Sequence, residues 1–132
     1  MVPLLFATYL AAANAACPDP ALANPRLKVV RADVRGFDDY IVTLDVTNRG
    51  QAAQNSGVDQ RLDLLQRGTV LGTQPIPALG PNQTYVTAFR IRVPHDRKRK
   101  PLDAEFRYVL ANARDLPRQN CTADNDVLSA KL

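Results

Sequence analysis

The sequence has little of the side-chain chemistry on which catalysis depends. Among its 132 residues there are one histidine (His95), two serines (Ser56 and Ser129) and no tryptophan. Neither serine lies in a nucleophile elbow, and no glycine-rich phosphate loop occurs. His95 has no second histidine or free thiol beside it to complete a metal set, which favours an ordinary surface loop. These absences predict a protein that is not an enzyme and uses no cofactor.

An excess of charge of one sign is also missing. The chain has 17 Lys and Arg against 13 Asp and Glu, a net charge of +4. The basic residues are spread over most of the sequence, whereas a nucleic-acid-binding domain concentrates a stronger positive charge on one face. We therefore expect no nucleic-acid partner.

Long apolar runs are confined to the start of the chain. Residues 1–15 carry no charged side chain and close with Ala13-Asn14-Ala15, the small-x-small pattern of signal-peptide cleavage, although a positively charged beginning is absent. We predict a signal peptide over 1–15 and a mature domain over 16–132, with no integral membrane segment after cleavage. A lipoprotein attached at Cys17 is opposed by Asn14, which stands where an apolar residue is expected. A buried N-terminal helix is opposed by the prolines that follow.

The two cysteines agree with export to the periplasm or the cell exterior. An even cysteine count after a signal peptide predicts a disulfide, here between Cys17 and Cys121. Such a bridge would close a loop of about a hundred residues, worth about 4 to 5 kcal/mol in the chain-entropy model. Unpaired thiols or a redox pair are the alternative, but no Cys-x-x-Cys spacing supports them.

What the sequence does contain is alternation of apolar and polar residues. In residues 40–50, Tyr40, Val42, Leu44 and Val46 share one face, as in a strand with one face buried. Similar patterns predict further strands at 26–34, 58–66, 69–73, 85–93, 102–110 and 127–132. Proline-rich segments 18–25 and 74–83 are expected outside the strands, and 36–39 as a turn. The predicted fold is all-β, an immunoglobulin-like antiparallel β-sandwich of about seven strands.

Four stretches in order, 40–50, 62–73, 76–89 and 120–126, resemble the CARDB family, the cell-adhesion-related domain found in bacteria. The residues that carry the resemblance are Val46, Asn48 and Gly50 for V-x-N-x-G, Leu79 and Gly80 as a loose match to L-x-x-G, and Asp124, Asn125 and Asp126 for the final turn. The resemblance covers 27–132. It implies an extracytoplasmic immunoglobulin-like module with a binding, adhesive or scaffolding role and no shared catalytic residues.

A run of charge at residues 95–100, His-Asp-Arg-Lys-Arg-Lys, is the main candidate for binding. Together with two arginines of the preceding strand it gives the predicted binding residues Arg90, Arg92, Arg97, Lys98, Arg99 and Lys100. A loop tip on a rigid sandwich is a common place for recognition, and consecutive cations attract anionic polymers or acidic protein faces. A merely solvated loop tip is the alternative.

The acidic turn Asp124, Asn125 and Asp126 could bind a hard cation through oxygen together with Asp38 or Asp39. Turn formation before the last strand explains the same residues, and we predict no metal site.

Two functions fit the sequence. One is a binding or adhesion module of the cell envelope that contacts a protein or an anionic polymer through loops at one end. The other is a structural accessory subunit that packs on a larger exported protein. The oligomeric state stays open.

Overall fold

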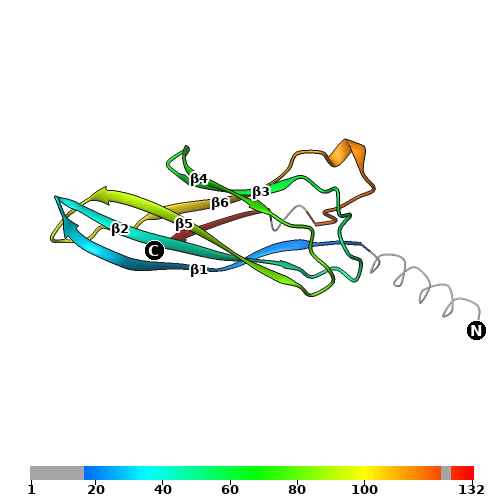
Figure 1. The fold of residues 1–132 in the computed structure, drawn as a ribbon, viewed down its shortest axis with the longest axis horizontal. Coiled ribbons are helices and arrows are strands. Elements are labelled where there is room, and N and C mark those ends of the chain that lie inside the picture. The colour runs from blue at the N-terminus through cyan, green and yellow to red at the C-terminus, as the bar shows by residue number, and fades with distance from the viewer. Residues whose placement is uncertain (1–16, 123–125) are drawn as a thin grey trace, which may run out of the picture.

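The computed structural model describes residues 17–122 and 126–132, and these form an elongated β-sandwich (Figure 1). Its elements are β1 (Pro20–Val34), β2 (Phe37–Asn48), β3 (Gln60–Gln66), β4 (Thr69–Ile76), β5 (Thr84–Pro94), β6 (Asp103–Leu110), the short 3₁₀ helix η1 (Ala113–Asp115) and β7 (Val127–Lys131). The all-β class predicted from the alternation is confirmed. No helix among the described residues is long and apolar enough to cross a membrane.

The strands form two antiparallel sheets. The three-stranded sheet has the order β1-β2-β5, and the four-stranded sheet has the order β4-β3-β6-β7. The chain therefore passes from one sheet to the other between β2 and β3, between β4 and β5 and between β5 and β6, as in immunoglobulin-like sandwiches.

The core lies between the sheets and follows the predicted alternation. Tyr40, Val42, Leu44 and Val46 are buried on β2, and they pack with the inward residues of the other strands. The largest fully buried side chains are Phe89 and Phe106, whose rings lie 6.4 Å apart at a tilt of 53°. This tilted contact joins one sheet to the other, because Phe89 belongs to β5 and Phe106 to β6.

Two strands are longer than the sequence predicted. β1 begins at Pro20 and β4 continues to Ile76, so Pro25 and Pro75 lie inside strands rather than in loops. Both strands are sheet edges, where the missing N–H of proline can face outward and costs no ladder hydrogen bond. The predicted turn at 36–39 was also misplaced: the turn residues are Arg35 and Gly36, both at positive φ, and β2 already includes Asp38.

The sandwich has two ends of different character. At one end lie Cys17, Cys121 and the loops 49–59, 77–83 and 111–122, and we call this the disulfide end. At the other lie the β1–β2 turn at Arg35–Gly36 and the β5–β6 loop 95–102, and we call this the basic end. In Figure 1 the basic end is on the left and the disulfide end on the right.

Candidate functional site

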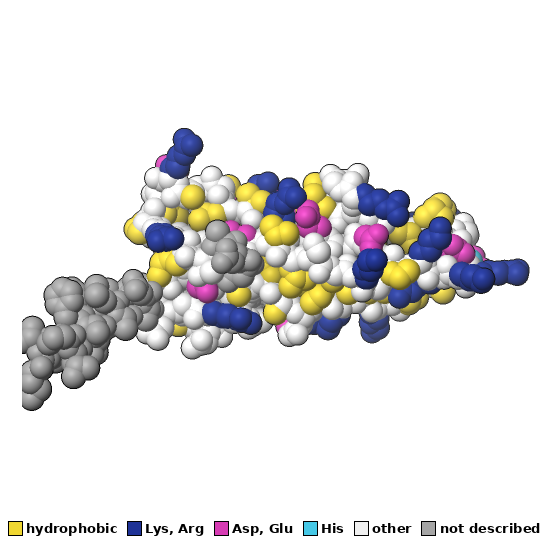
Figure 2. All heavy atoms as spheres, turned by 180° about the vertical axis from the view of Figure 1, so that it is seen from behind, with side chains coloured by type: hydrophobic (Ala, Val, Ile, Leu, Met, Phe, Trp, Pro, Cys, Tyr) yellow, Lys and Arg dark blue, Asp and Glu magenta, His cyan; other side chains and the backbone are white. Residues whose placement is uncertain are grey.

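The predicted basic run lies in the loop 95–102 and is exposed to solvent throughout residues 95–101. Figure 2 shows Lys and Arg side chains projecting from this end of the molecule, on the right in that view. Within the described part of the chain, Arg97, Lys98 and Lys100 form no ion pair. Their charges are therefore available to a partner from solution.

The loop is anchored at both of its ends by backbone hydrogen bonds. The N–H of His95 donates to the carbonyl of Gly36 at 2.9 Å. Leu102 and Leu132 exchange two bonds of 2.9 and 3.0 Å, so the loop ends on the last residue of the chain. Inside the loop, the N–H of Lys98 donates to the carboxylate of Asp96 at 3.1 Å. The cations are thus carried on a supported loop.

His95 and Asp38 form a pair beneath this loop. Nδ1 of His95 lies 2.9 Å from Oδ1 of Asp38, and the Asp38 side chain is only 7% exposed. The same carboxylate accepts the N–H of Asp33 at 2.7 Å and the hydroxyl of Tyr40 at 3.2 Å. Asp38 therefore ties β1, β2 and the β5–β6 loop together.

These contacts shift the pKa values of both Asp38 and His95. The hydrogen bond from the Asp33 backbone and then that from His95 lower the pKa of Asp38 below its usual value. The hydrogen bond to Asp38 raises the pKa of His95 above its usual value, and Asp33 adds to this from 3.9 Å. The charged form of the pair is favoured in mildly acidic solution.

Arg99 differs from its neighbours in the run because it folds back on the sandwich. Its guanidinium carbon lies 5.8 Å from the centre of the Tyr40 ring, and Nη1 donates to the carbonyl of Leu132 at 3.3 Å. Below it is a cavity of about 180 Å³, lined by apolar side chains of the three-stranded sheet and of the β5–β6 loop and by Gln66 of β3. Asp38, Asp96, Arg99 and Lys100 add charged groups to its wall.

Arg90 and Arg92 lie on a different surface, the outer face of the three-stranded sheet. The guanidinium of Arg92 donates two hydrogen bonds, of 2.7 and 3.2 Å, to the carboxylate of Asp39 on β2. Its central carbon lies 5.9 Å from the centre of the Phe37 ring. Arg90 stands opposite Ile41. The six predicted binding residues are therefore divided between the loop of the basic end and the adjoining sheet face.

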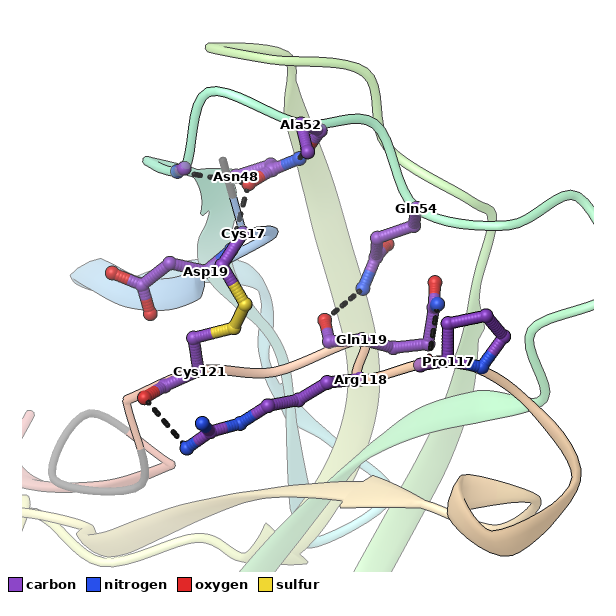
Figure 3. The surroundings of a disulfide bond; sticks show 10 residues. Cys17, Asp19, Asn48, Ala52, Gln54, Pro117, Arg118, Gln119 and Cys121 are labelled. Atoms are coloured by element: carbon purple, nitrogen blue, oxygen red, sulfur yellow. Dashed lines mark hydrogen bonds between the residues drawn. A yellow bond between two sulfur atoms is a disulfide. The ribbon is translucent and has the colours of Figure 1, made fainter. Parts of the chain in front are cut away.

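The disulfide end is held by a covalent bond and by buried amides (Figure 3). The predicted disulfide Cys17–Cys121 is confirmed, with Cα atoms 6.1 Å apart and a sequence separation of 104. Asn48, the asparagine of the V-x-N-x-G pattern, is fully buried. Its Oδ1 accepts the N–H groups of Asp19 and Gly50, and its Nδ2 donates to the carbonyls of Ala52 and Leu79.

The glycine of the same pattern is required by a close approach. A Cβ at Gly50 would lie 1.8 Å from the carbonyl oxygen of Cys17. The motif therefore fastens the loop after β2 to the start of β1, and its role here is structural.

Three buried glutamines extend this arrangement. Gln54 and Gln60 exchange two amide hydrogen bonds of 2.8 Å, and Gln54 also donates to the carbonyl of Gln119 at 3.3 Å. Tyr108 donates its hydroxyl to Gln60, and burial raises the pKa of Tyr108 to about 12. The network joins the loop after β2, the start of β3 and the loop after β6 at the disulfide end.

The possible cation site from the acidic turn does not assemble among the described residues. Asp126 lies at the disulfide end, where it accepts a hydrogen bond from Asn120, while Asp38 and Asp39 lie towards the basic end. Asp124 and Asn125 fall outside the described residues. In the part of the chain that is described, no group of three or more His, Cys, Asp or Glu side chains is placed to hold a metal ion.

The sequence interpretation missed the role of His95 and Asp38. The signal was present for Asp38, because it shares the even-numbered, inward phase of β2 with Tyr40 and Val42. An inward carboxylate at the end of a strand needs a partner. The histidine that supplies it is 57 residues further along, which no local pattern reveals.

Comparison with known proteins finds likeness at the level of structure. No family model matches the chain, and no curated protein matches it. A domain of a putative cell surface protein from Methanosarcina acetivorans is similar in structure, with 18% identity over 86% of this chain and 89% of that one and a TM-score of 0.56. The CARDB domain of a Pyrococcus furiosus protein, solved in complex with di-metal ions, has 16% identity over the same shares and a TM-score of 0.47.

At these identities the likeness is one of fold. The first structure shows the sandwich architecture, and we base no argument on the second because its TM-score is below 0.5. The sandwich fold that the resemblance implies is therefore found, while membership of the CARDB family stays a prediction.

Proposed function

We propose that this chain is an exported, non-catalytic binding module of the cell envelope that contacts an acidic protein face or an anionic polymer through its basic end. The observation that carries the proposal is the supported loop on which Arg97, Lys98 and Lys100 are exposed and form no ion pair within the described chain. Cations held in this way attract an anionic partner without first breaking an internal contact.

Export is supported by two features. The disulfide Cys17–Cys121 suits an oxidising compartment, and residues 1–15 have the pattern of a signal peptide. The similar structure from Methanosarcina acetivorans belongs to a putative cell surface protein, which agrees with this location.

A second candidate function is an accessory subunit that packs on a larger exported protein. The β1–β2 hairpin favours it, because Val29, Val30, Val34 and Phe37 are each between 42% and 47% exposed near the basic end. Exposed apolar side chains gathered in one region are typical of protein contacts.

The test is affinity capture from an envelope extract of the source cell, at low and at high salt. The mature protein is compared with R97Q/K98Q, which removes two charges of the loop, and with R49Q/R114Q, which removes two exposed charges at the disulfide end. The binding module is supported if an anionic partner is captured at low salt but not at high salt, and if R97Q/K98Q loses this capture while R49Q/R114Q keeps it. A single salt-resistant protein partner, retained equally by both variants, would overturn it in favour of the accessory subunit.

A further inference from the structure

The outer face of the three-stranded sheet carries a second group of cations. Five lie on it, Arg26, Lys28 and Arg31 from β1 and Arg90 and Arg92 from β5, against two carboxylates of β2, Asp39 and Asp45. Each carboxylate already has an arginine, because Arg26 pairs with Asp45 at 3.1 Å and Arg92 with Asp39 at 2.7 Å. Lys28, Arg31 and Arg90 form no ion pair within the described residues.

The register of the strands arranges four of these cations in two rows. Lys28 and Arg90 flank Ile41 in one row. Arg31 and Arg92 flank Asp39 in the next. Sheet geometry places cations of one row about 9.5 Å apart across two strand spacings, and the rows about 7 Å apart along the strands.

A bulge in β1 is what brings Arg31 into the second row. Val29 pairs with Tyr40 and Arg31 with Asp39, so Val30 is an extra residue with no partner on β2. Without it, Val30 would stand opposite Asp39 and Arg31 would point to the other face of the hairpin.

Between the rows the surface is hollowed and partly apolar. The hollow has a volume of about 570 Å³, and Arg31, Arg90, Arg92 and Asp39 lie around it. Its apolar surface comes from Val30 and Ile41, because Tyr40 and Ile91, which also line it, are buried in the core. That volume lies within the range of ligand sites. Arg92 is held in place there by its fork onto Asp39 and by the ring of Phe37.

The same face continues towards the disulfide end with three hydroxyl groups. Thr43, Thr47 and Thr84 lie at outward positions there, with Ala88, Asp45 and Val86 among them, and the Thr47 and Thr84 hydroxyls lie 2.7 Å apart. A hollow with cations around apolar side chains, and hydroxyl groups further along the same face, suits a polymer of rings that bear acidic groups and hydroxyls. Single-stranded nucleic acid would instead need exposed aromatic stacking platforms, but Tyr40 at this hollow is buried and the nearby Phe37 ring is covered by Arg92.

We propose that the outer face of the three-stranded sheet binds a linear acidic polysaccharide, with Lys28, Arg31, Arg90 and Arg92 holding its carboxylate or sulfate groups over Ile41. The proposal deepens the proposed function, since Arg90 and Arg92 belong to the predicted binding set, and rests on it in making the chain a binding module. It assigns the contact to the sheet face in addition to the loop.

Calorimetric titration with two probes tests it, polygalacturonate for carboxylates and heparin for sulfates. R31Q/R90Q should weaken binding of the better probe about tenfold or more, as expected for the loss of charge-assisted contacts. R49Q/R114Q carries the same charge change at the disulfide end and should stay within about twofold of the wild type. Neither double variant removes an ion pair, so both should fold, which far-UV circular dichroism checks.

A gain of binding gives a second and sharper readout. Asp39→Asn removes the carboxylate at the centre of the rows and releases Arg92, so affinity should rise severalfold. Asp115→Asn adds the same charge at η1 and should leave the affinity unchanged.

Equal weakening by R31Q/R90Q and R49Q/R114Q would mean attraction by net charge alone and would overturn the proposal. Tighter binding of oligo(dT) or poly-L-glutamate, with the same response to R31Q/R90Q, would overturn the polysaccharide assignment. Loss of binding in R97Q/K98Q but not in R31Q/R90Q would leave the proposed function standing and this inference refuted. The reverse pattern would support the sheet face and refute the loop.

Discussion

The disulfide end and the basic end secure their loops by different means. At the disulfide end, one covalent bond and a set of buried amides join three loops, and Asn48 alone uses its side chain for four hydrogen bonds. At the basic end a single carboxylate, Asp38, collects contacts from β1, β2 and the β5–β6 loop, while cations beyond it stay exposed. The first end fits a structural role that is insensitive to solution conditions, and the second combines support with available charge.

Removing the covalent bond should have the largest effect on this contrast. For C17S/C121S we expect the free energy of unfolding to fall by about 4 to 5 kcal/mol, because a crosslink spanning 104 residues restricts the unfolded chain strongly. Urea unfolding of the oxidised wild type and the variant measures it. A loss below about 1 kcal/mol would show that the amides hold this end without the bridge.

Asn48→Ala should have the next largest effect. It removes four hydrogen bonds, of which the one to the Leu79 carbonyl is buried and the other three are partly buried, and we expect a loss of about 3 kcal/mol. The matched control is Asn112→Ala, whose amide also bonds two backbone groups, Gly57 and Asp59, but in an exposed loop. Its cost should stay below about 1 kcal/mol. Equal losses in urea unfolding would contradict the importance of burial.

His95→Gln should remove the part of the pH dependence of stability that His95 contributes at the basic end. The raised pKa of His95 gives stability that is full below its ordinary value of 6.5 and is lost as the pH rises through the folded value. The lowered pKa of Asp38 gives stability that is full above 3.8 and is lost as the pH falls through the folded value. The stability difference between wild type and His95→Gln should therefore be widest between about pH 4 and 6.5 and shrink at higher pH.

Thermal or urea unfolding over that pH range measures this difference. The matched comparison is Asn48→Ala, whose deficit should be the same at every pH, since no titrating group bonds to the Asn48 side chain. A constant gap for His95→Gln would show that its pair with Asp38 is neutral in the folded protein.

The smallest effect on stability is expected for R97Q/K98Q. Neither side chain makes an ion pair in the described chain, so the free energy of unfolding should stay within about 0.5 kcal/mol of the wild type. Urea unfolding is the measurement. A larger loss would mean that the loop cations support the fold and are not reserved for a partner.

The sequence predicted most of the fold because alternation is a local signal. The buried faces of β2, β5 and β6 follow from the period of two, and the pairing of Cys17 with Cys121 follows from their number. The start of β1 was missed because Pro20 and Pro25 are read as loop residues unless the strand is known to be an edge. Which strand is an edge depends on the sheet order, and no single segment encodes that order.

The site could be predicted only in part for the same reason. The run from Arg97 to Lys100 is contiguous and visible in the sequence, whereas the pair of Asp38 with His95 depends on the register of β2 and β5. The bulge at Val30 cannot be predicted from the sequence of β1 either, because a residue is recognised as unpaired only once the register with β2 is known. The amide network of Gln54, Gln60 and Gln119 comes from three separate segments that approach one another only in the folded chain.

Cys17 and Leu132 lie at opposite ends of the sandwich, and this has a mechanical consequence. A partner held at the basic end and a second contact held at the disulfide end would pull the molecule along its length, parallel to the strands (Figure 1). The β1–β2 ladder would then be loaded in shear, so that many hydrogen bonds resist together. The bridge to Cys121 passes part of that tension from β1 to the segment that leads into β7, so both sheets would share the load.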